Sequence, residues 1–294
     1  MSQVYSRYFN NSLIRLVRSL RDHGLVQTLN ILVNLAFKLF IRALPVRYLN
    51  KIFSYRREVL GEELSKLLDG EVVSGPFKGL ILGSSDWGAR DRASMLLGCY
   101  EKEVAEKIVI LADESKYFVD IGAADGYYAL GVLSIRDFTH SICFESSEKS
   151  RKNIKDNARR NRLQDKVTIF GTAGIDFLQI LSNLGEFEIR KSIFLIDIEG
   201  GEYSLLSKEN LRKMEGAKII AELHEEEVSP ETVTEFITNA SEFFEVEFLT
   251  TNSRNPSSFT QLDSWSDNDR WIVFSEGRNR LMRWAVLTPK GAQY

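Results

Sequence analysis

Acidic and small residues with the spacing of a ligand-binding loop stand near the middle of this chain. The apolar run Tyr117–Ile121, which contains Asp120, leads directly into the loop Gly122–Gly126. An apolar run, a small-residue loop and a renewed helical pattern predict a buried strand, a tight turn and a helix. Glycine permits positive φ values and lets a ligand approach the backbone closely. The free amides at the start of the helix suit a carboxylate or a phosphate.

Carboxylates also follow later predicted strands. Glu145 stands about 25 positions after Asp120, where an acid can accept hydrogen bonds from ribose hydroxyls. Doubly wound sheets bind ligands at the carboxyl ends of their strands, so we expect one acidic pocket there. Such a pocket suits an ammonium and a sulfonium group better than a phosphate. The loop also lacks the middle glycine of a dinucleotide fingerprint, which disfavours a dehydrogenase. The acids of this edge are Asp120, Glu145, Asp197, Glu199, Glu202 and Glu222.

Two motifs are similar to those of known methyltransferases. The spacing Asp-x-Gly-x-Ala-x-Gly over residues 120–126 resembles motif I of class I S-adenosylmethionine-dependent methyltransferases. The run from Asp197 to Glu202 resembles the Ile-Asp-Val-Glu-Gly-Ala-Glu signature of the FkbM-type family, and Leu97–Glu103 is similar to that family's segment before motif I. Gly201 stands where alanine is usual, and Ala124 where asparagine or glycine is frequent. The resemblance covers roughly residues 95–225 and implies a class I fold and methylation of a hydroxyl, commonly on a sugar or natural product.

Carried over by position, the resemblance implies where the cofactor binds. Glu145 would take the ribose hydroxyls, and Asp197 would face the methionine amino end or the substrate. The implied S-adenosylmethionine-binding residues are Tyr100, Glu101, Asp120, Gly122, Ala123, Ala124, Gly126, Glu145, Ser146, Thr172 and Asp197.

A histidine after the fifth predicted strand is the candidate general base. Methyl transfer requires orientation of the reactants, and a base should activate a sugar hydroxyl. We predict His224 for that role, with Glu222 on the same strand face to orient the ring. The alternative is a solvated histidine at a helix start. Asp197, Glu199, Glu222 and His224 could instead hold a divalent cation, so metal use stays open.

Four further residues are candidates for contact with the acceptor. Tryptophans can stack on sugar rings, although most such residues are core or loop anchors. An acid in a first helical turn can simply stabilise the helix dipole. The long polar loop from Thr250 to Asn268 is the best candidate for a mobile lid. The acceptor candidates are Glu199, Glu202, Trp265 and Trp271.

The net charge of −3 conceals a strong asymmetry. Residues 1–57 contain ten Lys or Arg and one acid, a charge of +9, and the remainder carries −12. A basic arm of this kind points to an acidic surface, lipid or nucleic acid.

With 44% hydrophobic and 27% charged residues the chain can form a packed core. Cys99 and Cys143 make no disulfide framework or zinc pattern, which fits a reducing, cytosolic setting.

The basic arm contains two amphipathic segments, Leu13–Leu20 and Leu25–Leu44. In the second, polar residues recur every fourth position from Asn30 to Arg42, and this stripe argues against a spanning helix. A wide apolar face with basic residues and almost no acid is typical of a helix lying in a membrane interface. The alternative is a helix that packs on the domain or on a second subunit. No signal peptide is evident.

From Tyr117 onward, strands alternate regularly with helices. This alternation predicts βαβ units with right-handed crossovers and a mostly parallel sheet, closed by an antiparallel pair. The run Glu71–Gly83 predicts a hairpin. The predicted fold is α/β, a doubly wound seven-stranded Rossmann-like sheet with a helical arm and connector (1–70) before the catalytic domain (71–294). The predicted strands are 117–121, 140–144, 166–170, 192–197, 217–222, 244–249 and 281–288, and the predicted helices 126–135, 147–160, 174–184, 201–214, 230–241 and 268–277.

Together these features predict an S-adenosylmethionine-dependent O-methyltransferase acting on a saccharide or lipid-linked saccharide in surface polysaccharide or glycolipid synthesis. We expect a cytoplasmic protein, peripheral on the inner face of the membrane through residues 10–57, with a homodimer left open. A nucleic-acid, protein or natural-product methyltransferase and a non-enzymatic partner subunit are the alternatives. Nucleic acid is not expected, because the catalytic part has no basic, aromatic-interleaved groove and no Asn-Pro-Pro motif.

Overall fold

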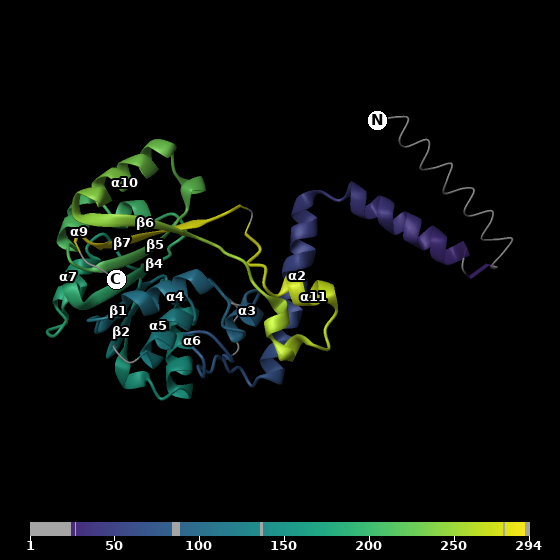
Figure 1. The fold of residues 1–294 in the computed structure, drawn as a ribbon, viewed down its shortest axis with the longest axis horizontal. Helices are drawn as coiled ribbons and strands as arrows, with labels where there is room; N and C mark the ends of the chain where they lie inside the picture. Colours follow the sequence, from purple (N-terminus) through teal and green to yellow (C-terminus); the bar gives the residue numbers. More distant parts are fainter. Residues whose placement is uncertain (1–24, 27, 84–88, 136–137, 279, 292–294) are drawn as a thin grey trace. The chain divides into compact units, whose positions relative to one another are not determined.

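The chain forms two compact units, Met1–Ile52 and Phe53–Tyr294. A computed structural model describes residues 25–26, 28–83, 89–135, 138–278 and 280–291 (Figure 1). The predicted amphipathic segment Leu13–Leu20 lies outside the described residues. The larger unit begins before the predicted boundary at residue 71, because Leu60 and Leu64 of α2 (Val46–Leu67) are buried in one of its hydrophobic clusters.

The described part of the smaller unit is helical. A helix spans Thr28–Ala43, and the chain leaves the helical conformation at residues 44–45 before α2 begins. Pro45 explains the break, since proline disfavours helical geometry in the residue before it and lacks an amide donor. Among the described helices none is by itself both long and apolar enough to cross a membrane. Only the bent pair Thr28–Ala43 and Val46–Leu67 meets that criterion jointly.

The described residues of the larger unit form a seven-stranded sheet of order β3-β2-β1-β4-β5-β7-β6. Strands β1 to β5 pair in parallel, and β7 runs antiparallel to both of its neighbours, β5 and β6. The predicted doubly wound α/β class and the antiparallel closing pair are confirmed. The strands are β1 (Tyr117–Ile121), β2 (His140–Phe144), β3 (Val167–Phe170), β4 (Ser192–Ile196), β5 (Lys218–Leu223), β6 (Phe244–Thr250) and β7 (Arg283–Pro289).

The central strands are mostly apolar and almost entirely buried because both faces of the sheet are covered. All residues of β4 and β5 are buried, as expected for parallel strands between two helical layers. The edge strand β6 instead alternates between more and less buried residues. The chain reverses direction across the sheet between β1 and β4, which pair in parallel. Ligands of doubly wound sheets bind outside the strand ends at this point.

Helices cover both faces of the sheet (Figure 1). On one face α4 (Lys102–Leu111), α5 (Tyr127–Gly131) and α6 (Glu148–Arg160) contribute residues to a cluster that includes Phe118 and Leu195. The other face is covered by α7 (Phe177–Ser182), α8 (Glu202–Leu205), α9 (Lys208–Lys213) and α10 (Pro230–Phe243).

A third cluster joins the C-terminal half of α2, α3 (Arg92–Leu96) and α11 (Asp267–Ile272). The segment predicted as a mobile lid belongs to this cluster. It forms two short 3₁₀ turns, η5 (Pro256–Ser258) and η6 (Thr260–Leu262), and Leu262 is fully buried. Arg56 of α2 pairs with Asp269 at 2.7 Å. These contacts argue against a lid.

Local departures from the predicted elements have local causes. Residues 71–83 form one isolated bridge, Glu71 to Ile81, rather than the predicted hairpin. The predicted helix 201–214 is two helices, because the side chain of Ser207 accepts a hydrogen bond from the Asn210 amide and starts α9 afresh. The remaining 3₁₀ turns are η1 (Val132–Ser134), η2 (Gln164–Lys166), η3 (Ile189–Lys191) and η4 (Glu225–Glu227).

Candidate functional site

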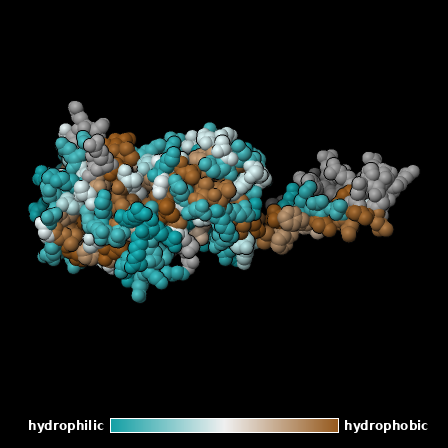
Figure 2. Space-filling view, turned by 90° about the horizontal axis from the view of Figure 1, so that it is seen from below, coloured by the Kyte–Doolittle hydropathy of each residue, from teal (hydrophilic) through white to brown (hydrophobic). Residues whose placement is uncertain are grey.

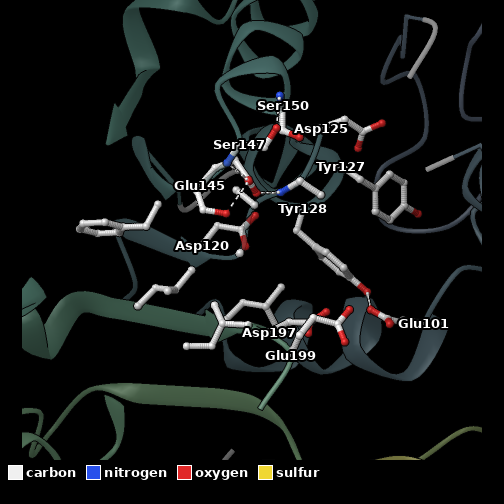
Figure 3. Close-up of a pocket in the computed structure, with 18 of the residues that line it drawn as sticks. Glu101, Asp120, Asp125, Tyr127, Tyr128, Glu145, Ser147, Ser150, Asp197 and Glu199 are labelled. Atoms are coloured by element: carbon white, nitrogen blue, oxygen red, sulfur yellow. Dashed lines mark hydrogen bonds between the residues drawn. The ribbon is translucent and has the colours of Figure 1, made fainter. Parts of the chain in front are cut away.

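A cavity of about 780 Å³ opens at the carboxyl ends of β1, β2 and β4 (Figure 3). Its volume lies within the ~300–1,000 Å³ typical of small-molecule sites. The three acids on which the prediction depends, Asp120, Glu145 and Asp197, line this one cavity. The predicted residues that line it are Tyr100, Glu101, Asp120, Gly122, Ala123, Ala124, Glu145, Ser146, Thr172, Asp197 and Glu199.

The loop after β1 requires glycine at its first position. Gly122 has φ 97°, and a Cβ built there would lie 1.7 Å from the carbonyl oxygen of Asp197. The loops after β1 and β4 are this close because the Asp197 amide donates to the Ile121 carbonyl at 2.9 Å. Only a residue without a side chain lets the two strand ends meet here.

Backbone amides fix the carboxylate of Glu145. Ala124, at φ 46°, directs its amide to Oε2 at 2.8 Å, and the amide of Ser147 donates to Oε1 at 2.7 Å. A left-handed alanine costs roughly 1–2 kcal/mol, and such strain tends to concentrate at functional sites. Figure 3 shows Glu145 held in this way beside Asp120. The carboxylate retains free lone pairs for a ligand's hydroxyls.

Gly126, a predicted cofactor contact, is not part of the cavity lining. It precedes α5 with φ 86°, and a Cβ there would touch Ile154 and Leu130 at 3.3 Å. Its role is therefore to complete the turn and to let α5 pack closely.

The opposite wall of the cavity comes from distant parts of the chain. Tyr128 donates its hydroxyl hydrogen to Glu101 Oε2 at 2.9 Å. Trp284 of β7 is 1% exposed and also lines the cavity. The guanidinium of Arg278 lies 4.9 Å from the Trp284 ring centroid.

Arg278 joins three buried acids and was not predicted. It contacts Glu101 and Glu222, and its Nε donates to Glu276 at 2.9 Å. No motif surrounds Arg278 in the sequence, so the only available signal is its position just before the last predicted strand. Glu222, predicted to orient His224, is instead bound to this arginine.

The cavity carries a large excess of acids over bases. Among its described lining residues, seven are acidic and only Arg90 is basic. Burial raises the pKa of Asp120 to about 8. Desolvation in the cavity wall and the charge of Glu101 raise the pKa of Asp197 to about 7. A cationic ligand would relieve this repulsion. The seven acids are Asp91, Glu101, Asp120, Asp125, Glu145, Asp197 and Glu199.

His224 lies behind the cavity wall among carboxylates. Its Nδ1 is 3.0 Å from Glu202 Oε1, and its Nε2 is 3.5 Å from Glu199 and 3.8 Å from Asp197. Burial alone lowers the pKa of His224, but the bond to Glu202 and the charges of Glu202, Asp197 and Glu222 raise it to about 9. The ring is therefore a cation at neutral pH, which argues against the predicted role as a base.

Glu202 supports the turn after β4 rather than facing an acceptor. It is 1% exposed and accepts hydrogen bonds from the amides of Ile198 at 2.8 Å and Gly200 at 2.9 Å. Because these bonds and His224 occupy the carboxylate, the predicted substrate contact is wrong for this residue.

The two predicted stacking tryptophans do not line the cavity. Trp265 packs in the third hydrophobic cluster, and Trp271 is 56% exposed on α11. The aromatic residue that reaches the cavity from this end of the chain is Trp284.

Two groups of side chains have a spacing that a metal ion could use. They are Asp197 with Glu202 and His224, and Glu101 with Asp197 and Glu222. A protein cation already contacts each group, since His224 bonds to Glu202 and Arg278 pairs with Glu101 and Glu222. Metal use remains an open prediction.

The chain matches no protein-family profile and no curated protein sequence. Among solved structures it is similar to TrmK, a tRNA methyltransferase of Bacillus subtilis, with 8% identity, a TM-score of 0.40, and coverage of 63% of this chain and 64% of that one. It is also similar to TrmK of M. capricolum in complex with S-adenosyl-homocysteine (8% identity, TM-score 0.40, 63% and 67% covered). A precorrin-6y methyltransferase of Geobacter metallireducens gives 11% identity and a TM-score of 0.42, with 65% and 89% covered. Likenesses this low carry no argument about activity.

Proposed function

We propose that this chain is an S-adenosylmethionine-dependent O-methyltransferase whose acceptor is a hydroxyl of a saccharide or lipid-linked saccharide. The observation that carries the proposal is the acid-lined cavity at the strand switch point. In its wall, Gly122 exposes backbone without a side chain, and two backbone amides hold the carboxylate of Glu145. The finer resemblance to the FkbM-type family rests on the motif from Asp197 to Glu202.

The cavity fits the cofactor better than it fits a phosphate-bearing nucleotide. Seven acids line the cavity and favour an ammonium and a sulfonium over phosphates. Three of them, Asp91, Glu101 and Asp125, already pair with arginines, so the attraction rests on the other four. Glu145 would take the ribose hydroxyls, and Gly122 would let the ligand lie against the backbone. When bound, S-adenosylmethionine supplies a methyl group on a positively charged sulfur.

The residues around the cavity then have three tasks. The two strand-end loops orient the ligand, and Tyr100, Tyr127 and Trp284 exclude water. Asp197 is the better placed base, because it lines the cavity and its pKa of about 7 suits proton acceptance near neutral pH. His224, 3.8 Å from Asp197, is a positioning residue whose positive charge favours the carboxylate form. Glu199, whose side chain is 74% exposed, is at the rim where an acceptor would arrive.

The acceptor class follows from charge and from the family resemblance. An acidic rim opposes a polyanion such as nucleic acid. A neutral saccharide hydroxyl meets no such barrier. We place the reaction in surface polysaccharide or glycolipid synthesis, on the cytoplasmic side of a membrane.

A calorimetric titration tests the cofactor part of this proposal. The protein should bind S-adenosylmethionine and S-adenosyl-homocysteine and should not bind NAD, whose pyrophosphate the acids repel. Binding of NAD alone would refute the assignment.

The acceptor is tested by transfer of a tritiated methyl group to neutral oligosaccharides, lipid-linked saccharides and tRNA. Asp197→Asn should lower the methylation rate by about 10²–10⁴ and leave cofactor affinity within a few fold. Labelling of tRNA and of no saccharide would overturn the acceptor assignment while leaving the cofactor assignment intact.

A further inference from the structure

The helix Thr28–Ala43 presents a wide apolar face to solvent. Val33, Phe37 and Phe40 are 59%, 60% and 59% exposed. At 100° per residue the exposed apolar side chains occupy one continuous side of the helix, nearly half of its circumference. Figure 2 shows apolar residues gathered along one side of this segment. The large exposed apolar residues of this helix and the two residues described just before it are Leu25, Val26, Leu29, Leu32, Val33, Phe37, Leu39 and Phe40.

After the break at Pro45, the first turns of α2 also carry exposed apolar side chains. Val46 and Ile52 are 70% and 52% exposed. Monomeric soluble proteins rarely expose a continuous apolar patch larger than a few hundred Å². A surface of this extent indicates a binding partner.

The charge of the segment selects the partner. Residues 28–52 contain Lys38, Arg42, Arg47 and Lys51 and no acid. Lys38 and Arg42 lie on the polar stripe with Asn30 and Asn34, opposite the apolar face. Basic side chains beside a broad apolar face match the phosphates and acyl chains of an anionic lipid surface.

A second copy of the chain fits this segment less well. A two-fold interface would bury the apolar face of both copies but would leave the basic stripe, on the opposite side of the helix, without a partner. An anionic lipid surface accounts for both the apolar face and the basic residues.

We propose that residues 28–52 bind the surface of an anionic membrane. The apolar face lies among the acyl chains, and the basic residues contact the lipid phosphates. The larger unit, in a part of the chain with net negative charge, is repelled by the same surface and stays in water.

Vesicle co-flotation of the full chain tests this proposal. The protein should float with phosphatidylcholine vesicles containing 30% phosphatidylglycerol and remain unbound with pure phosphatidylcholine. Binding should weaken as salt rises, because screening shortens the reach of the basic charges. Absence of binding to the anionic vesicles would overturn the proposal.

Matched variants locate the contact. Phe37→Ser with Phe40→Ser should weaken binding to the anionic vesicles by about tenfold or more, because two aromatic rings no longer leave water. Lys38→Gln with Arg42→Gln should weaken it by about fivefold for each charge removed. The control is Ile175→Ser with Leu281→Ser, which removes two side chains that are each 68% exposed on the larger unit and should change nothing. An equal loss in the control would refute the assignment to residues 28–52.

Two further measurements separate this proposal from its alternatives. Light scattering that shows a dimer, dissociated by the double phenylalanine variant, would assign the face to a second copy instead. Calorimetric titration with S-adenosylmethionine should give the same affinity in every variant, so failure at the membrane is distinguishable from failure of the proposed activity.

Discussion

The two walls of the cavity are built in different ways. The wall at the ends of β1, β2 and β4 is set by backbone: Gly122 against the Asp197 carbonyl, and two amides on Glu145. The facing wall is set by side chains from three distant segments, in which Arg278 and Tyr128 hold Glu101 and Trp284 also lines the cavity. Every residue of the first wall directly follows a strand, whereas the second wall is assembled from segments that share no such position.

This difference indicates how each wall should fail. A wall set by backbone contact tolerates no added atom where the two backbone segments come closest. It survives the loss of surrounding side chains. A wall of paired charges fails when one partner is removed, since the other charges remain buried without compensation. Substitutions on the two walls therefore separate geometry from electrostatics.

Gly122→Ala should have the largest effect. The new Cβ cannot be 1.7 Å from a carbonyl oxygen, so the ends of β1 and β4 must separate. We expect a loss of about 5 kcal/mol in free energy of unfolding, among the largest single-substitution effects. Urea denaturation measures it. Gly171→Ala is the control, because nothing lies within 4 Å of that position. Equal stability of the two variants would contradict a wall set by backbone contact.

Arg278→Met should have the next largest effect. It leaves Glu101 and Glu222 buried without their cation, so the free energy of unfolding should fall by about 3 kcal/mol. This value is at the low end for a broken buried ion pair because the arginine side chain is one-fifth exposed. Adding Glu222→Gln to this variant should restore part of the loss. The exposed Arg280→Met serves as the control in thermal melts. A stable single variant would show that the acids do not need the arginine.

Glu145→Gln should weaken cofactor binding while leaving the fold in place. An amide offers one oxygen for two backbone donors and places an NH₂ group against the Ala124 or Ser147 amide. The expected loss is about 1.5–3 kcal/mol in S-adenosylmethionine binding, tenfold or more in affinity by calorimetry. Glu148→Gln, at the first residue of α6, should bind normally. Unchanged affinity in Glu145→Gln would remove this residue from the ligand contacts.

The smallest predicted effect is a trend with pH. The folded-state pKa of His224 is raised to about 9, so its stabilisation is complete below about 6.5 and is lost as pH rises through 9. Asp120, with its pKa raised to about 8, also makes the folded protein bind more protons than the unfolded chain. Both groups therefore lower stability as pH rises, and the melting temperature should fall between pH 6 and pH 9.

Asp120→Asn should flatten that trend, because the amide does not titrate. At pH 8 the variant should melt a few degrees above the original protein, since about 1 kcal/mol corresponds to roughly 2–4 °C in a domain of this size. Asp165→Asn, on the surface, is the comparison. A melting temperature that rises between pH 6 and pH 9 would contradict the predicted loss of stability with rising pH.

The sequence was sufficient for the backbone wall. Each of its residues directly follows an apolar run whose length and composition predict a strand, and parallel strands bring their ends to one edge. The same logic located Glu145 and Asp197. It predicted the last strand but could not show that this strand inserts between β5 and β6, which brings Trp284 to the cavity. Arg278 precedes that strand and pairs with Glu101 and Glu222 from distant segments, a contact that no local pattern indicates.

The errors around His224 and the tryptophans have a similar cause. Strand position alone placed Glu222 beside His224, whereas the partner of His224 is Glu202, the first residue of α8. The sequence could not tell which of the C-terminal tryptophans lines the cavity, because all are the same residue type. Trp265 lies away from the cavity because it packs against a separate hydrophobic cluster.

The insertion of β7 between β5 and β6 has a consequence for synthesis on the ribosome. Until residues 283–289 emerge, β5 and β6 have no common neighbour, and both present unpaired backbone edges. The nascent larger unit therefore cannot close its sheet or its cavity early, however much of the preceding chain has already folded. Chaperones that shield exposed strand edges would have their longest opportunity to act at this stage.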